Sequence, residues 1–154
     1  MTDRSVTHAT FGLERHYAVD PARVFAAWAD PAAKARWFAA PEGEYELDFR
    51  VGGREVIRAR RADGPDLTCE SWYRDIVPGE RIVYTSTLYA DEDVATVSLT
   101  TVEFSGADGG GTRLLLTEQG TFLDGREDPD WRERGTGDWL DAIDAELKRT
   151  DGPA

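Results

Sequence analysis

The sequence PDWRERGTGDWLDAIDAELKRT, residues 129–150, decides the fold, because it predicts one long amphipathic helix that needs a large apolar surface to lie on. Asp128 is expected to cap the first turn, with Pro129 at the first helical position, where a missing N–H costs nothing. Gly152-Pro153 is expected to end the helix. At 1.5 Å per residue, such a helix spans roughly 33 Å, about the width of a small domain.

One face of this helix carries large apolar side chains at steps of four residues. The row consists of Trp131, Trp139, Ile143 and Leu147. Gly135 lies in the same row between the two tryptophans, and a mid-helix glycine costs roughly 1 kcal/mol relative to alanine. Two interpretations stay open: sequence drift in a helix held by its packing, or a gap that leaves room for a ligand between helix and sheet.

Upstream of this helix, the pattern predicts one strand, two short helices and six further strands. Residues 11–19 alternate apolar and polar side chains, as a strand with one buried face does. Asp20-Pro21 and Asp30-Pro31 each combine a helix cap with a proline, and predict two short helices over residues 21–30 and 31–40. The six strands are expected at residues 44–50, 55–61, 67–77, 81–88, 94–104 and 112–122.

The connections between these strands are short, so the strands are expected to follow one another in antiparallel order. Gly52-Gly53 predicts a two-residue hairpin turn between the first two of them. The order of elements predicts an α+β fold in which a strongly curved seven-stranded antiparallel sheet surrounds the long C-terminal helix. A cavity is expected wherever the side chains of sheet and helix do not meet. We expect one domain over residues 1–154, with its core at about 11–150.

The composition narrows the classes of function. The 154 residues include 18 basic and 30 acidic side chains, for a net charge of −12. Such a surface disfavours nucleic acids and anionic membranes, which bind to basic patches. Cys69 is the single cysteine, so no internal disulfide can form, and the first residues do not resemble a signal peptide. A cytoplasmic location is expected.

The residue types that carry most catalytic chemistry are scarce. His8 and His16 are the two histidines, and no His/Cys spacing matches a zinc site. A Ser/His/Asp triad and a phosphate-binding loop are not indicated either, because the glycine run at 109–111 lies between two predicted strands. We therefore predict no metal and no cofactor.

Three charged residues share the apolar side of their predicted strands. Glu118 alternates in step with Leu114 and Leu116, and by the same test Glu55 and Arg15 face inward. A buried carboxylate must be paired or protonated. One hypothesis is that Arg15, Glu55 and Glu118 form a polar cluster in the cavity. The alternative is that the two glutamates lie at strand ends, where the mouth of the cavity is wet.

Glu118 is the only catalytic candidate, as a general acid or base in an apolar cavity. Its other interpretation is a hydrogen-bond partner that orients a bound ligand. The aromatic side chains either fill the core or line the cavity. Ser86 and Thr100 would add hydroxyl donors to the cavity if they lie on the inner face of the sheet. The complete set of candidate ligand-binding residues is Trp37, Phe49, Glu55, Ile57, Trp72, Tyr84, Ser86, Thr100, Glu118, Trp131, Gly135 and Trp139.

Five segments in order resemble the SRPBCC superfamily, and more narrowly its activator-of-Hsp-ATPase-homologue (AHSA-type) branch. They are ERHYAVDPARVFAAWADPAAKARWF (14–38), ELDFRVGGRE (46–55), YRDIVPGERIVYTS (73–86), GGGTRLLLTEQGTF (109–122) and GTGDWLDAIDAEL (135–147). The resemblance implies the helix-grip fold of START lipid carriers and birch-pollen allergens, with a hydrophobic cavity under the C-terminal helix. It does not imply one activity, since the superfamily includes carriers, polyketide cyclases and chaperone activators.

Three functions stay open at this point. The first is binding of a small hydrophobic molecule in the cavity. The second is a polyketide cyclase or dehydratase type of enzyme that uses Glu118 as acid or base. The third is a protein-interaction module similar to chaperone activators. A monomer and a homodimer are both compatible with the sequence.

Overall fold

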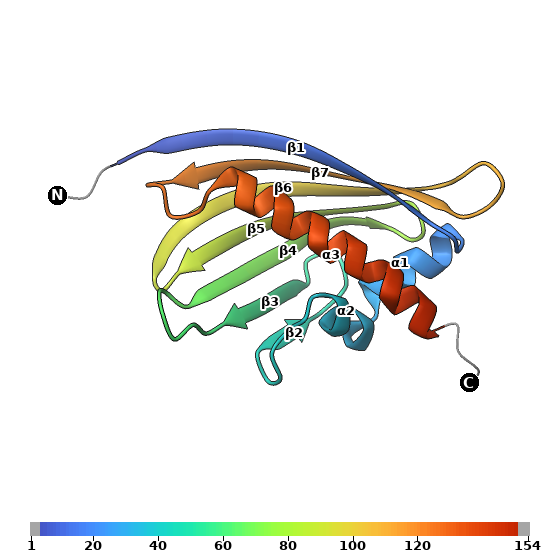
Figure 1. Ribbon diagram of the computed structural model, residues 1–154, viewed down its shortest axis with the longest axis horizontal. Helices are drawn as coiled ribbons and strands as arrows, with labels where there is room; N and C mark the ends of the chain where they lie inside the picture. Colours follow the sequence, from blue (N-terminus) through green and yellow to red (C-terminus); the bar gives the residue numbers. More distant parts are fainter. Residues whose placement is uncertain (1–3, 151–154) are drawn as a thin grey trace.

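In the computed structural model, which describes residues 4–150, a long C-terminal helix lies across one face of a curved antiparallel sheet of seven strands (Figure 1). The strands are β1 (Val6–Tyr17), β2 (Tyr45–Leu47), β3 (Arg54–Ala59), β4 (Leu67–Val77), β5 (Arg81–Ala90), β6 (Asp93–Gly106) and β7 (Thr112–Leu123). The helices are α1 (Pro21–Ala29), α2 (Pro31–Trp37) and α3 (Pro129–Thr150). The predicted α+β helix-grip arrangement is confirmed.

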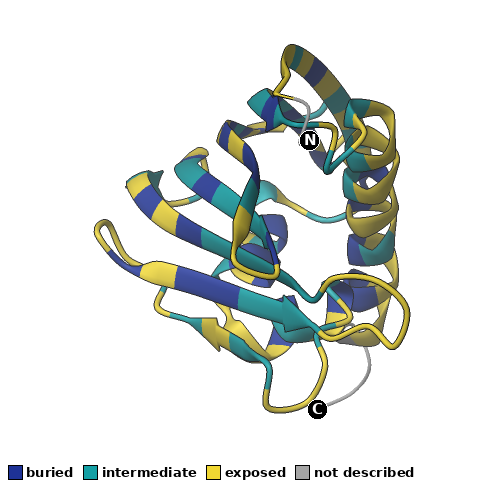
Figure 2. Ribbon diagram, turned by 90° about the vertical axis from the view of Figure 1, so that its left-hand side faces the viewer, coloured by how far each residue is buried: buried dark blue, intermediate teal, exposed yellow. Residues whose placement is uncertain are grey.

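The strands follow the order β1-β7-β6-β5-β4-β3-β2. All neighbours are antiparallel, and β1 pairs with β7 from Val6 opposite Leu123 to Tyr17 opposite Thr112. The first strand of the chain therefore adjoins the last one, while β2 to β7 form a meander. Figure 2 shows α3 as a separate layer beside the sheet, with buried and exposed residues alternating along the strands.

Helix α3 begins where the sequence predicts. Oδ1 of Asp128 accepts a hydrogen bond from the backbone N–H of Asp130 at 2.9 Å, which confirms the predicted cap. The predicted stop at Gly152-Pro153 lies outside the described residues. Leu140, Ile143 and Leu147 are buried, as one face of an amphipathic helix requires.

The apolar row of α3 is not buried along its whole length. Trp131 and Trp139 of this row are 64% and 37% exposed, whereas Ile143 and Leu147 are buried. The C-terminal half of α3 packs into the core, whereas its N-terminal half passes over a cavity. None of the helices within residues 4–150 is long and apolar enough to cross a bilayer.

The two short helices close one end of the sheet (Figure 1). Asp20 and Asp30 cap them through hydrogen bonds from the backbone N–H groups of Arg23 and Ala32. The indole N–H of Trp37 donates to the carbonyl of Ala27 at 2.8 Å, which fixes α2 against α1. This packing directs the α2 side chains toward the sheet.

The connection between β2 and β3 differs from the prediction. Strand β2 ends at Leu47, and the connection spans residues 48–53 instead of the two glycines alone. Gly52 donates its N–H to the carbonyl of Tyr73, and Tyr73 donates its N–H to the carbonyl of Gly53. A Cβ on Gly53 would lie 2.1 Å from the carbonyl oxygen of Asp48. The close packing within the connection therefore requires a glycine at position 53. Strands β2 and β3 still form an antiparallel hairpin, but the predicted two-residue turn between them is wrong.

Candidate functional site: a cavity under the C-terminal helix

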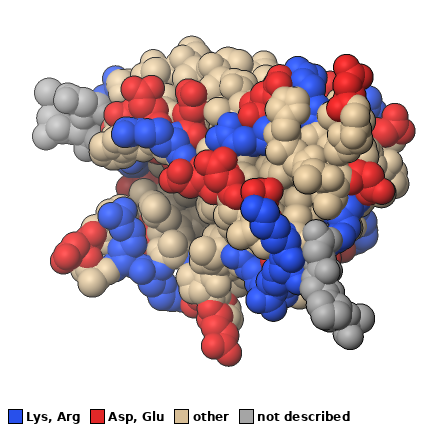
Figure 3. All heavy atoms as spheres, turned by 45° about the vertical axis from the view of Figure 1, so that its right-hand side comes forward, with Lys and Arg blue, Asp and Glu red and all other residues tan. Residues whose placement is uncertain are grey.

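A cavity of about 250 Å³ lies between the inner face of the sheet and the N-terminal half of α3. Side chains of β3 to β7 form its floor, α1 and α2 close one end, and α3 crosses over it. In Figure 3 the molecule is hollowed on one side, with uncharged atoms inside the hollow and charged side chains along its rim. The mouth is therefore polar, and the interior is mostly apolar.

Most of the predicted ligand-binding residues lie on the wall of this cavity. They are Trp37, Glu55, Ile57, Tyr84, Ser86, Thr100, Glu118, Trp131, Gly135 and Trp139. An added Cβ on Gly135 would meet no atom within 4 Å, so the helix leaves open space there. The ring of Trp139 stacks on Phe38 with a centroid distance of 4.3 Å.

Two predicted residues lie elsewhere. Phe49 packs edge-on against Phe25 and Tyr73 in the core, with centroid distances of 5.7 and 4.9 Å. It belongs to the connection after β2, where the alternation of a strand does not apply. Trp72 is 38% exposed and lies under the guanidinium of Arg54, on the other face of the sheet from its buried neighbour Tyr73.

The predicted cluster of Arg15, Glu55 and Glu118 does not form. Nε of Arg15 donates to Oδ1 of Asp141 at 2.7 Å, and Nη2 donates to the carbonyl of Gly137. Arg15 thus lies on the face of the sheet that packs against α3, as its strand position predicts. It bonds to the helix outside the cavity and does not line the cavity wall. The two glutamates are paired with cations from the helices instead.

Lys34 of α2 is the partner of Glu55. Its Nζ lies 2.7 Å from Oε2 of Glu55 and donates to the hydroxyl oxygen of Tyr73 at 3.2 Å. The hydroxyl of Tyr45 donates to the same Glu55 oxygen at 2.5 Å. Lys34 is 0% exposed. Five ring centroids lie 4.6–5.8 Å from Nζ, those of Trp28, Trp37, Phe38, Tyr73 and Tyr84.

The environment of this pair keeps the neighbouring phenols protonated. Burial, and after it the negative charge of Glu55, raises the pKa of Tyr45 well above its usual range. The same two causes raise the pKa of Tyr73. The phenol hydrogen bonds and the aromatic faces around Lys34 help to offset the loss of hydration that burial imposes on the Lys34–Glu55 pair.

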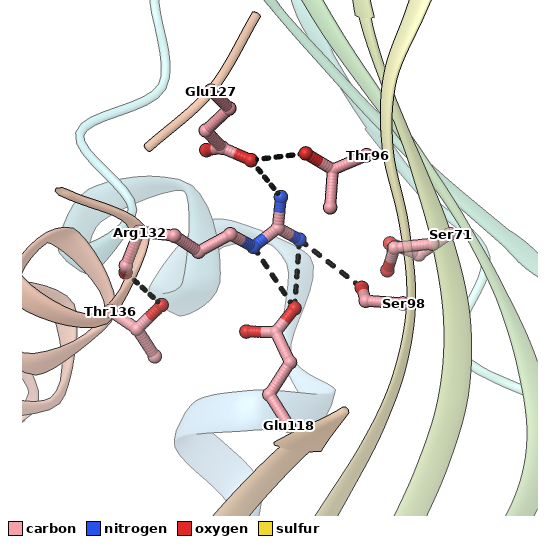
Figure 4. A network of polar contacts seen from close by, with 8 residues as sticks. Ser71, Thr96, Ser98, Glu118, Glu127, Arg132 and Thr136 are labelled. Carbon is pink, nitrogen blue, oxygen red and sulfur yellow. Dashed lines mark hydrogen bonds and ion pairs between the residues drawn. The ribbon is translucent and has the colours of Figure 1, made fainter. Parts of the chain in front are cut away.

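Arg132 of α3 is the partner of Glu118 (Figure 4). Its Nε and Nη2 lie 3.0 and 2.8 Å from Oε2 of Glu118, while Nη1 donates to Oε1 of Glu127 at 2.9 Å. Nη2 also donates to Ser98, and the hydroxyl of Thr96 donates to Glu127 at 2.6 Å. Burial alone would lower the pKa of Arg132, but the two carboxylates outweigh it and raise the pKa. The guanidinium therefore ties the start of α3 to β6 and β7.

The floor of the cavity adds neutral polar groups. The hydroxyl groups of Ser71 and Ser86 lie 2.7 Å apart and bond to each other. Cys69 lies beside them on the cavity wall, and burial raises the pKa of its thiol to about 11. Among residues 4–150, no three His, Cys, Asp or Glu side chains converge as a metal ion requires.

The sequence reasoning missed both cations, although the sequence carries a signal for each. Ile143 and Leu140 lie on the buried face of α3. Two steps of four residues back from Leu140 lead to Thr136 and Arg132, so Arg132 lies on the same side of the helix. Lys34 precedes Trp37 by three residues, which places the two on the same face of α2.

A curved sheet around a long C-terminal helix, with a cavity between them, defines the helix-grip class of proteins. Within this class, the chain belongs to the family described as activator of Hsp90 ATPase homolog 1-like protein, whose family model matches residues 18–148. The resemblance to AHSA-type SRPBCC proteins is thereby confirmed.

Solved structures support the same assignment. A protein from Rhizobium leguminosarum is 43% identical, with 96% of this chain and 99% of that chain covered and a TM-score of 0.89. Protein Mll3558 from Rhizobium loti is 44% identical over 92% of this chain and 99% of that one, with a TM-score of 0.86. CV1439 from Chromobacterium violaceum is 30% identical over 88% and 95%, with a TM-score of 0.70. No curated protein matches the chain at a significant level.

Proposed function

We propose that the protein binds a small, mostly hydrophobic molecule in the cavity under α3. The observation that carries this proposal is the cavity of about 250 Å³, which has aromatic and aliphatic walls and a small number of fixed polar groups. Pockets of this composition bury most of a small ligand and orient it through their few polar atoms. Membership of the family is consistent with this function and specifies no ligand.

The geometry favours an orienting role for Glu118 over a catalytic one. Its Oε2 is held by two nitrogens of Arg132, so the residue is half of an ion pair and not a free carboxylic acid. The cyclase or dehydratase interpretation needs this side chain to exchange a proton with a substrate. The interpretation as a chaperone-activator-like module rests on family membership alone.

Filling the space at Gly135 tests the proposal. Gly135→Leu is expected to weaken binding of the uncharged fluorescent probe N-phenyl-1-naphthylamine by at least tenfold, because Gly135 lines the cavity and a larger side chain there should take up part of its space. The fold should be retained, since a Cβ meets no atom within 4 Å and leucine favours a helix over glycine by several tenths of a kcal/mol. A fluorescence titration measures the affinity, and thermal unfolding measures the stability.

Gly135→Ala is the matched control. It gives a similar gain in helix propensity, about 1 kcal/mol, but adds only one methyl group. Probe affinity should therefore stay within about threefold of the original protein, a free-energy change below 1 kcal/mol. If Gly135→Leu binds the probe as well as Gly135→Ala does, the probe does not occupy this cavity and the proposal is wrong.

A further inference from the structure

We infer that the cavity selects a hydrophobic amine, whose ammonium group bonds to the unoccupied oxygen of Glu118, over a carboxylic acid of the same shape. This inference rests on the proposed function and specifies the chemical class of its ligand. It follows from the way in which the charged side chains of the cavity are bonded.

Each of the three carboxylates on the cavity wall bonds to the protein through one oxygen only. Arg132 bonds to Oε2 of Glu118 and to Oε1 of Glu127, and Lys34 lies against Oε2 of Glu55. No residue of the described part of the chain donates a hydrogen bond to the second oxygen of any of the three. Figure 4 shows this for Glu118, where every contact ends on the same oxygen.

The second oxygens of the two most buried carboxylates open onto the cavity. Glu55 and Glu118 are only 4% and 5% exposed, and both line the cavity. Within residues 4–150, Nε1 of Trp28 is the one fully enclosed side-chain nitrogen or oxygen without a hydrogen-bond partner. The free oxygens of Glu55 and Glu118 are therefore not sealed in the protein, and the space that they face is the cavity. A buried acceptor of this kind favours a ligand that carries a donor.

The two cations, Lys34 and Arg132, in contrast, are each already paired with a carboxylate. All three nitrogens of the Arg132 guanidinium are bonded, to Glu118, Glu127 and Ser98. Lys34 is enclosed by its rings and by Glu55. A ligand carboxylate would find each of these cations already paired with a glutamate and would add a further buried negative charge, which is unfavourable.

The sum of the charges points the same way. Four charged residues line the cavity, Glu55, Glu118, Glu127 and Arg132, and Lys34 lies directly behind Glu55. Three negative and two positive charges leave one negative charge without a counterion. An ammonium group would neutralise it, and the mostly apolar lining of the cavity makes that interaction stronger than it would be in water.

The aromatic walls suit a cation as well. The rings around Lys34 already hold one ammonium group against their faces, at 4.6 Å in the case of Phe38. Trp131 and Trp139 of α3 line the same cavity as Glu118 and Arg132, and no cation of residues 4–150 lies over their rings. An amine in this cavity would therefore share it with two indole rings that hold no cation.

Three naphthalene derivatives of matched size test the inference: 1-naphthylmethylamine, 1-naphthylmethanol and 1-naphthoic acid. Calorimetric titration at pH 7 is expected to rank the amine at least tenfold tighter than the acid, with the alcohol in between. In Glu118→Gln the amine should lose about tenfold in affinity, whereas the alcohol should change by less than threefold. The exposed Glu103→Gln serves as the control and should leave all three affinities unchanged.

The outcomes separate this inference from the proposed function. If the acid or the alcohol binds with the same affinity as the amine, the inference that the cavity selects for charge is wrong. The proposed function would still stand, because the cavity would then bind ligands without regard to their charge. If none of the three binds, the inference is wrong, and the titration with N-phenyl-1-naphthylamine decides whether the proposed function fails with it. The ranking in the unsubstituted protein decides the inference even if Glu118→Gln does not fold.

Discussion

Replacing Lys34 by methionine is expected to lower the free energy of unfolding by about 3–5 kcal/mol, because Glu55 would remain buried without its cation. For a domain of this size, each kcal/mol shifts the melting temperature by about 2–4 °C, so a decrease of roughly 10 °C is expected. Urea denaturation followed by tryptophan fluorescence measures the free energy, and calorimetry measures the melting temperature.

A second substitution identifies the cause of that loss. Lys34→Met combined with Glu55→Gln removes both charges and leaves the hydroxyl of Tyr45 an oxygen to bond to, so at least half of the lost stability should return. Lys148→Met, at an exposed helix pair with Asp144, should change stability by less than about 0.5 kcal/mol. A loss below about 1 kcal/mol for Lys34→Met would contradict the buried pair.

Arg132→Met is expected to have the second largest effect, a loss of about 3 kcal/mol or more. The substitution leaves Glu118 and Glu127 without their shared cation and removes the contacts that tie the start of α3 to the sheet. Chemical denaturation measures the loss. Hydrogen exchange should show that the first turns of α3 lose protection before the last ones, because Ile143 and Leu147 still pack in the core.

Two variants control for the position and the charge. Arg134→Met removes an arginine from the exposed side of the same helix and should change stability by less than about 0.5 kcal/mol. Adding Glu118→Gln to Arg132→Met should recover part of the stability, since one of the unpaired charges is then gone. If Arg132→Met is as stable as Arg134→Met, the network does not hold α3 on the sheet.

The elements of the fold were predictable because local signals and burial patterns agree. The aspartate–proline pairs mark the starts of all three helices, and Asp128 caps α3 as expected. The alternation of β7 placed Glu118 on the same face as the buried Leu114 and Leu116. These inferences need only the geometry of one helix or one strand at a time.

The pairing of the charges was not predictable in the same way. Strand alternation states that Glu55 and Glu118 face inward, but the cations Lys34 and Arg132 come from helices whose position over the sheet depends on tertiary packing. Arg15 shows the limit of the argument, since it points to the helix side and still pairs with Asp141 outside the cavity. With Arg132 as the partner of Glu118, the substitution Glu118→Leu is expected to lower the melting temperature, because it leaves the guanidinium without that carboxylate.

The central claim is that the space between α3 and the sheet holds a small molecule, and the modification rate of Cys69 tests it most directly. Cys69 is the single cysteine and lies on the cavity wall, with a thiol pKa of about 11. Its reaction with methyl methanethiosulfonate should accelerate from pH 8 toward pH 11 as the thiolate forms. At pH 9, saturating N-phenyl-1-naphthylamine is predicted to slow the reaction at least tenfold by occupying the cavity. A rate that does not change under saturating probe would contradict the claim.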